Sequence, residues 1–265
     1  MRDPEVKIEQ AWLGRESRPS CRFLDRDHAS ATVRGEDGVR DRHELVMETT
    51  ETALAQVQDA RRYPDLQVLR AHFTGWRFYH HFRSDPESPL RQPRPGTMTP
   101  RLAGDGHDLA SALQTIREIG DERALAEAID RLQPGARLEV ADVDGQGSLD
   151  VRLHTPGLLR PVTSRELSDG TLRYLALVAA LLSPRPAPLL AFNEPESSLH
   201  PAMLPALAVL FVQAAAHSQV WVTTHSIALA EALAAASGSK PLRLELVEGA
   251  TRIIGQSLLG EIMEE

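Results

Sequence analysis

The sequence is poor in the features that mark secreted and membrane proteins. Its 265 residues include one cysteine, Cys21, so internal disulfides are excluded and a reducing compartment is indicated. No stretch approaches eighteen uncharged apolar residues, and the N-terminal segment MRDPEVKIEQ has no hydrophobic signal region. The sequence therefore predicts a cytoplasmic protein with no membrane span.

Lysine and several catalytic motifs are also scarce or missing. Only Lys7 and Lys240 are lysines among 29 basic residues, and the net charge of −8 gives no global attraction to nucleic acid. The sequence contains no G-x-S-x-G, no H-E-x-x-H and no paired His/Cys ligand spacing. A metal-dependent hydrolase or nuclease is therefore disfavoured, although acidic residues could still serve one.

The composition is that of an ordinary globular protein, with 42% hydrophobic and 25% charged residues. The length suits one large domain or two small ones. We expect a single domain over 1–265, with a β-rich segment at 1–50, a mainly helical middle at 51–135 and an α/β core at 136–265.

Local patterns predict the elements of this domain. Short strands and a turn at 35–38 are expected in the first fifty residues, and a helix over 50–72 is interrupted near Pro64. The proline-rich segment 83–101 predicts an extended surface loop. The remaining expectations are a strand within 75–82, helices at 107–119 and 121–132, a hairpin turning at 144–147, and helices at 168–182, 201–216 and 226–236 that alternate with strands at 188–193, 219–224 and 241–247. Such alternation predicts an α/β fold with a mostly parallel sheet flanked by helices.

The apolar run PLLAF ends abruptly in polar residues. It predicts a buried parallel strand that delivers Asn193, Glu194 and Glu196 to the sheet edge where open α/β folds bind ligands. A carboxylate there can ligate Mg²⁺ or polarise a water molecule for attack on phosphate. The alternative is a solvated strand end without a ligand.

The segment LSDGT precedes an apolar helix. Ser168 stands where an N-cap belongs, and Gly170 leaves the backbone N–H groups of the first turn open to a ligand. A helix N-terminus of this kind favours anions such as phosphate. A helix cap with no ligand is the alternative.

A third polar residue follows the strand VWVTT. His225 comes directly after it, at another carboxyl end of the predicted sheet, where it could contact a phosphate or an attacking water; a structural histidine is the alternative. Ser168, Glu194 and His225 are separated by 26 and 31 residues, enough for one helix and one strand each time.

Together, LSDGT, LLAFNE, SSLHP and THS resemble the C-terminal half of the ABC-type ATPase domain, in the branch of AAA-family ATPases related to RecF- and SMC-like proteins. The resemblance extends to GWRFYHHF and DGHDLASALQTI. It implies a P-loop NTPase half-fold in which 167–171 is the signature motif, 189–194 the Walker B strand and 197–201 the D-loop.

The resemblance also implies ATP and Mg²⁺ as cofactors, an ATP-dependent homodimer, and ties to DNA repair or defence with DNA as a partner. The arginines of RRYPDLQVLR and RQPRPGTMTPR are candidates for phosphate contacts, or for solvated faces. The implied site residues are Glu194 and His225 in catalysis, Ser168, Asp169, Gly170 and Asn193 in cofactor binding, with Asn193 reaching Mg²⁺ through water, and Ser197, Ser198, Leu199 and His200 in the D-loop.

Two features depart from the family pattern. Asn193 stands where Walker B usually has Asp, which removes a charge that favours the cation. No G-x-x-x-x-G-K-[ST] segment is present, because Lys7 precedes Ile8 and Lys240 precedes Pro241. Either the reading frame is truncated at its N-terminus, or the chain is a degenerate, non-catalytic interaction module that keeps the fold.

Overall fold

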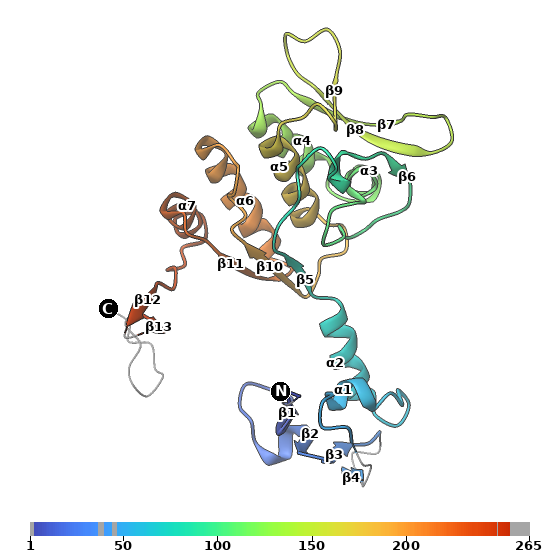
Figure 1. Ribbon diagram of the computed structural model, residues 1–265, viewed down its shortest axis with the longest axis vertical. Coiled ribbons are helices and arrows are strands. Elements are labelled where there is room, and N and C mark those ends of the chain that lie inside the picture. The colour runs from blue at the N-terminus through green and yellow to red at the C-terminus, as the bar shows by residue number, and fades with distance from the viewer. Residues whose placement is uncertain (1–2, 37–39, 44–46, 248, 255–265) are drawn as a thin grey trace. The chain divides into compact units, whose positions relative to one another are not determined.

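The computed structural model describes residues 3–36, 40–43, 47–247 and 249–254, and its elements are labelled in Figure 1. The chain divides into two compact units, Met1–Trp76 and Arg77–Glu265. Each unit has its own cluster of buried apolar side chains. The expectation of one ATPase-like domain over 1–265 stays a prediction.

The first unit contains an antiparallel sheet whose strands are neighbours in chain order. They are β1 (Ile8–Trp12), β2 (Arg22–Asp27), β3 (Ser30–Arg34) and β4 (Arg40–His43), with the short 3₁₀ turn η1 (Pro19–Cys21) before β2. The N-terminal β-rich segment is thus confirmed. The turn predicted at 35–38 lies partly outside the described residues.

Two helices follow this sheet, α1 (Ala53–Gln56) and α2 (Pro64–Thr74). The predicted interruption near Pro64 is a true break: proline starts α2, where its missing N–H is not needed by the helix. Arg26 on β2 is 1% exposed. Its guanidinium donates to the carbonyls of His28, Glu48 and Glu51, so the buried charge is fully hydrogen-bonded and ties the strand to the loop before α1.

A parallel sheet forms the centre of the second unit, as expected, and has the order β11–β10–β5. Its strands are β5 (Arg77–Tyr79), β10 (Leu189–Asn193) and β11 (Gln219–Thr223). Of the predicted strand within 75–82, only Arg77–Tyr79 pairs. The strand expected at 241–247 does not join this sheet: β12 (Leu244–Val247) pairs instead with β13 (Ala250–Ile253) in an antiparallel hairpin.

The helices α3 (Leu109–Ile119), α4 (Glu122–Leu132), α5 (Asp169–Leu181), α6 (Leu204–Ala215, after the 3₁₀ turn η3, Pro201–Met203) and α7 (Ile227–Ser237) belong to the same unit (Figure 1). Helix α5 is deeply buried: Leu172 and residues 174–181 all lie in the core, with at most 6% exposure. On the adjoining strand, Phe192 stacks on Tyr79 at 5.1 Å and meets Phe211 edge-on at 5.0 Å. This packing holds the carboxyl end of β10 rigidly.

A second sheet of this unit is antiparallel. The predicted hairpin is confirmed as β7 (Arg137–Asp142) and β8 (Ser148–His154), and β8 also pairs with β6 (Arg94–Pro95) and β9 (Val162–Thr163).

The prediction of an extended surface loop over 83–101 holds only in part, because residues 85–87 and 94–98 are exposed while others are buried. This segment contains the 3₁₀ turn η2 (Pro89–Arg91), and Ser88, Leu90 and Thr99 are buried. Hydroxyl groups of α3 make the burial feasible, because Ser111 and Thr115 accept hydrogen bonds from the backbone N–H groups of Thr97 and Thr99. None of the helices in the described residues has the length and apolar character needed to cross a bilayer.

Candidate functional site

The carboxyl ends of β10 and β11 lie side by side, with Asn193 opposite Thr223. Asn193 Oδ1 accepts a 2.8 Å hydrogen bond from Thr223 Oγ1, and Glu194 N donates to Thr223 O at 2.8 Å. Glu194 has a φ of 47°, in the left-handed region that non-glycine residues seldom occupy. This backbone turn ends the strand, and the chain leaves the sheet at Glu194.

Glu194 and His225 come together at this edge, where the sequence placed them. Glu194 Oε1 lies 3.2 Å from His225 Nε2. The side chain of Glu194 is 43% exposed and that of His225 is 91% exposed. A carboxylate and an imidazole in contact, both open to solvent, can accept, hold and pass on a proton of a ligand or of an attacking water.

Glu196 has a role that the strand pattern did not specify. Its Oε1 accepts hydrogen bonds from Thr224 Oγ1 and, at 3.3 Å, from Ser226 N. These two residues flank His225, so the carboxylate holds a side-chain hydroxyl on one side of the histidine and the backbone on the other. Its Oε2 is buried without a hydrogen-bond partner among the described residues.

Ser168 caps α5, as the sequence predicts. Its Oγ accepts a 3.2 Å hydrogen bond from Thr171 N, and Asp169 and Gly170 form the first turn. A Cβ on Gly170 would lie 2.6 Å from the carbonyl oxygen of Ser198. The glycine is therefore required by the close approach of the 197–200 segment, independently of any ligand.

The 197–200 segment is attached to α5 by hydrogen bonds. Arg173 in α5 donates to Ser197 O at 3.1 Å and to Ser198 Oγ at 2.8 Å, and also to Phe82 O at 3.1 Å. Ser198 has a φ of 67°. Leu199 packs against the core, and His200 Nδ1 accepts from Ala202 N at 3.2 Å.

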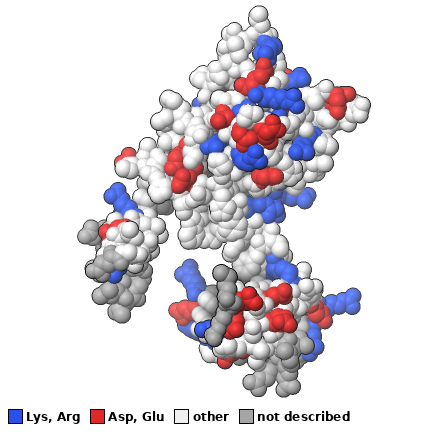
Figure 2. All heavy atoms as spheres, in the orientation of Figure 1, with Lys and Arg blue, Asp and Glu red and all other residues white. Residues whose placement is uncertain are grey.

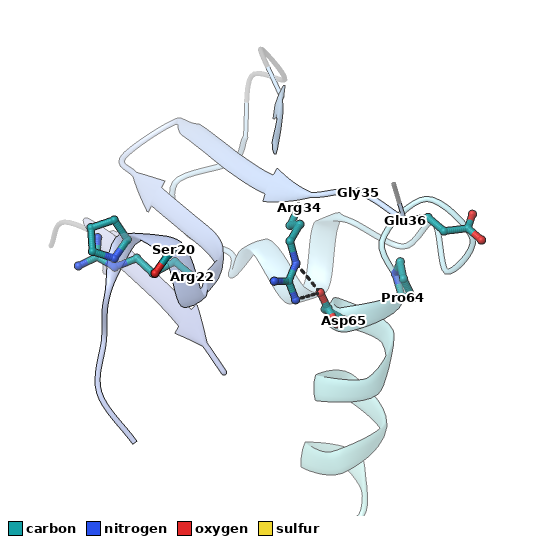
Figure 3. Close-up of a pocket in the computed structure, with 8 residues that line it drawn as sticks. Ser20, Arg22, Arg34, Gly35, Glu36, Pro64 and Asp65 are labelled. Carbon is teal, nitrogen blue, oxygen red and sulfur yellow. Dashed lines mark hydrogen bonds and ion pairs between the residues drawn. The ribbon is translucent and has the colours of Figure 1, made fainter. Parts of the chain in front are cut away.

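A small cavity lies between these elements. It measures about 20 Å³ and is lined in part by Phe82, Arg173, Asn193, Glu194 and Ser197. A space of this size does not enclose a nucleotide, so a ligand here would lie largely on the surface of the unit. A much larger pocket, of about 800 Å³, lies in the first unit (Figure 3), and none of the predicted site residues lines it.

The arginines considered as phosphate contacts are partly engaged inside their units. Arg70 donates to the carbonyls of Leu54 and Val57. Arg91 is buried and donates to backbone carbonyls and to Asp169. The hydrogen bonds of these two arginines inside their units disfavour a contact with phosphate, and the nucleic-acid contact stays a prediction for the other arginines of the two segments. Figure 2 shows acidic and basic side chains interspersed on the face in view.

Comparisons with known proteins place the chain in a family. Residues 8–231 match the model of an AAA domain described as a putative AbiEii toxin of a type IV toxin–antitoxin system. Because the match covers most of the sequence, the chain belongs to this AAA-domain family, as the sequence motifs indicated. No curated protein matches the sequence.

The solved structures that match this chain include SMC ATPases and SMC head domains. One, from work on ATP-driven dimerisation and DNA-stimulated activation of SMC ATPases, has a TM-score of 0.43 and 22% identity, covering 56% of this chain and 89% of that chain. An SMC head bound to the C-winged helix domain of ScpA has a TM-score of 0.48 and 16% identity, covering 86% of this chain and 67% of that chain. The SMC head domain from Thermotoga maritima has a TM-score of 0.42 and 14% identity, covering 90% of this chain and 71% of that chain.

Proposed function

We propose that this chain carries the signature, Walker B and switch-histidine parts of an ABC-type ATPase site that hydrolyses ATP between two protomers. The observation that carries the proposal is the contact of Glu194 with His225 at 3.2 Å at the carboxyl end of a parallel sheet. The capped N-terminus of α5 belongs to the same unit and supplies backbone N–H groups suited to an anion.

In this proposal Glu194 is the general base and His225 positions it. The carboxylate accepts the proton of the attacking water. The imidazole in contact with the carboxylate orients it and stabilises its negative charge before the transfer. Glu196 keeps His225 in place through Thr224 and Ser226. Magnesium-bound ATP, when present, supplies the electrophilic γ-phosphoryl group.

The oxygen donors near Glu194 fit a cation that arrives with phosphates. Magnesium in such sites is held by one or two protein oxygens and by phosphate oxygens. Asn193 Oδ1 keeps a lone pair after its bond from Thr223. Within the described residues no group of three or more His, Cys, Asp or Glu side chains is arranged to hold a metal ion alone. Asn193 would therefore contribute to Mg²⁺ binding through water.

The 265 residues contain no G-x-x-x-x-G-K-[ST] segment and so do not supply the P-loop that this proposed site needs. Phosphate binding in this class depends mainly on that loop's N–H groups and lysine. We therefore expect the 265-residue chain to bind ATP weakly or not at all. A chain extended by any in-frame P-loop-coding sequence upstream of Met1 in its gene should hydrolyse ATP with Mg²⁺ dependence and dimerise on ATP.

Glu194→Gln tests the assignment of the base. In the ATP-hydrolysing form, the substitution should lower turnover by about 10²–10⁴-fold, because the amide keeps the shape but cannot take the proton. ATP affinity should stay within a few-fold. Steady-state turnover and equilibrium ATP binding measure the two effects, and robust Mg²⁺-dependent hydrolysis that survives Glu194→Gln would show that the site is wrongly assigned.

A second candidate is a non-catalytic interaction module that keeps the fold. Asn193 in place of the usual carboxylate, together with the absent P-loop motif, favours it. Calorimetric titration of the extended chain with ATP and Mg²⁺ separates the ATPase from the non-catalytic module. An ATPase should show heat of binding, and a non-catalytic module should show none.

A further inference from the structure

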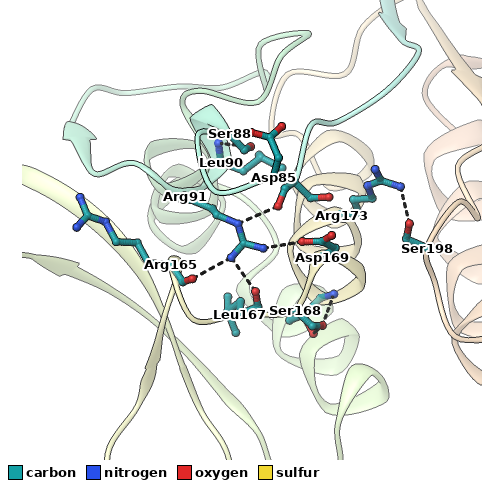
Figure 4. A network of polar contacts seen from close by, with 12 residues as sticks. Asp85, Ser88, Leu90, Arg91, Arg165, Leu167, Ser168, Asp169, Arg173 and Ser198 are labelled. Carbon is teal, nitrogen blue, oxygen red and sulfur yellow. Dashed lines mark hydrogen bonds and ion pairs between the residues drawn. The ribbon is translucent and has the colours of Figure 1, made fainter.

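Arg91 is a buried cation outside the residues assigned above. It lies in the turn η2 and is 8% exposed. All three guanidinium nitrogens donate hydrogen bonds: Nε to Ser84 O at 2.9 Å, Nη2 to Asp169 Oδ1 at 2.7 Å, and Nη1 to the carbonyls of Ser164, Arg165 and Leu167 at 2.8–3.1 Å. Figure 4 shows the side chain at the centre of this network.

The partners of Arg91 surround the N-cap of α5. Leu167 O and Asp169 Oδ1 belong to the residues immediately before and after Ser168. One guanidinium therefore holds the backbone of Leu167 and the side chain of Asp169. Ser168 Oγ, between them, accepts its hydrogen bond from Thr171 N. Arg91 itself is held in place, because Ser164 Oγ donates to its carbonyl at 3.0 Å.

Charge gives the pairing a second effect. Asp169 sits in the first turn of α5, where its carboxylate would repel an incoming phosphate. The guanidinium neutralises that carboxylate and holds it through the Oδ1 contact. Lysine could supply the charge but not the contacts, since an ammonium is a compact donor and the planar fork of arginine spans several acceptors at once.

We propose that Arg91 is a positioning residue for the 167–170 turn, setting the conformation in which the α5 N-terminus receives a phosphate. The ligand half of this statement rests on the proposed function; the conformational half does not. Arg91 touches no reacting group, so its effect is transmitted through Leu167 and Asp169.

The test compares Arg91→Lys with Arg101→Lys in the 265-residue chain. Arg101 belongs to the same proline-rich segment and also donates to backbone carbonyls, those of Arg185 and Pro186, which follow the C-terminal end of α5, the end opposite Ser168. Amide hydrogen exchange of Thr171 and Leu172, followed by NMR, reports the cap. Amides in the middle of α5, from 175 to 178, report the stability of the helix as a whole.

With Arg91→Lys we expect exchange at Thr171 and Leu172 to accelerate at least tenfold more than at 175–178. Arg101→Lys should leave the cap amides within about twofold of the parent chain. Equal exchange in Arg91→Lys and the parent, or acceleration spread uniformly along α5, would overturn the proposal. If Arg91→Lys does not fold, Asp169→Asn decides: it removes the charge that pairs with Arg91 and faces the helix N-terminus, and no acceleration of exchange at Thr171 counts against the proposal.

The ligand half is measured in the ATP-hydrolysing form. Arg91→Lys should raise the ATP concentration needed for half-maximal dimerisation about tenfold, and Arg101→Lys should not. Unchanged ATP-driven dimerisation in Arg91→Lys overturns this half. A parent protein that never responds to ATP overturns the proposed function instead, and the exchange measurement still decides the conformational role of Arg91.

Discussion

Gly170 shows how one residue can satisfy a motif for a reason unrelated to its ligand. A side chain at this position would press on the Ser198 carbonyl at 2.6 Å, and backbone atoms cannot rotate away as a side chain can. The glycine of LSDGT is thus needed to join α5 to the 197–200 segment before any nucleotide is considered.

Replacing Gly170 with Ala should therefore destabilise the second unit by about 1–3 kcal/mol, the usual range for overpacking, although alanine is the better helix former. Gly104→Ala is the matched control, because its added Cβ would find its nearest atom at 3.8 Å. Urea unfolding of both variants measures the difference. Equal midpoints for the two would mean that the 197–200 segment moves aside freely.

The arginines teach a second lesson at this scale. Arg91 and Arg94 stand three positions apart in one proline-rich run, yet Arg91 is buried and Arg94 is exposed. Composition alone assigns both to a charged surface. The difference arises because the carbonyls of Ser164, Arg165 and Leu167 converge on Arg91.

Among the elements, the β7–β8 hairpin carries a turn held by two aspartates. Asp144 accepts hydrogen bonds from Ser148 Oγ, Gln146 N and Ser148 N. These bonds, that from the Ser148 hydroxyl first, lower the pKa of Asp144 from 3.8 to about 2. Asp142 accepts from the N–H groups of Asp144, Gly145 and Gly147.

The lowered pKa of Asp144 predicts an acid-dependent contribution to stability. Because the folded-state pKa lies below the unfolded value, the contribution is complete above about pH 4 and is lost as the pH falls toward 2. Asp144→Asn should thus be less stable than the parent at pH 6, with the gap closing between pH 4 and pH 2. Thermal unfolding midpoints across this range measure the gap, and a gap that stays constant would contradict the assignment.

For the whole molecule, the division into two units leads to a prediction about folding. The buried cluster of the second unit begins at Tyr79 and that of the first ends at Leu66. Each cluster is thus built from one unit's residues. The second unit is also long enough to bury a core of its own.

Residues 77–265 expressed alone should therefore unfold cooperatively and retain the hydrogen-exchange protection of α5 seen in the full chain. Calorimetry and exchange on the fragment provide the measurement, with the full chain as reference. A fragment that shows no cooperative transition would indicate that the single domain expected over 1–265 is the correct description.

Local pattern was sufficient for much of this protein. The helical spacing of apolar residues located α3 and α5, and Ser168 was recognisable as a cap because a cap and its helix lie within a few residues. Glu194 and His225 could be placed at one sheet edge because parallel strands end on the same side. A strand does form within 241–247, but it pairs with β13 and not with the parallel sheet, because the apolar pattern of one strand does not specify its partner.

Folding alone brought together the contacts that hold the candidate site. Arg91 reaches Asp169 across 78 residues and Glu196 reaches Thr224 across 28, while Gly170 meets Ser198 only after α5 and the 197–200 segment are in place. The local sequence around each of these residues does not predict its partner. The sequence does not distinguish a buried arginine from an exposed one. The packing of distant backbone carbonyls around the side chain decides which arginine is buried.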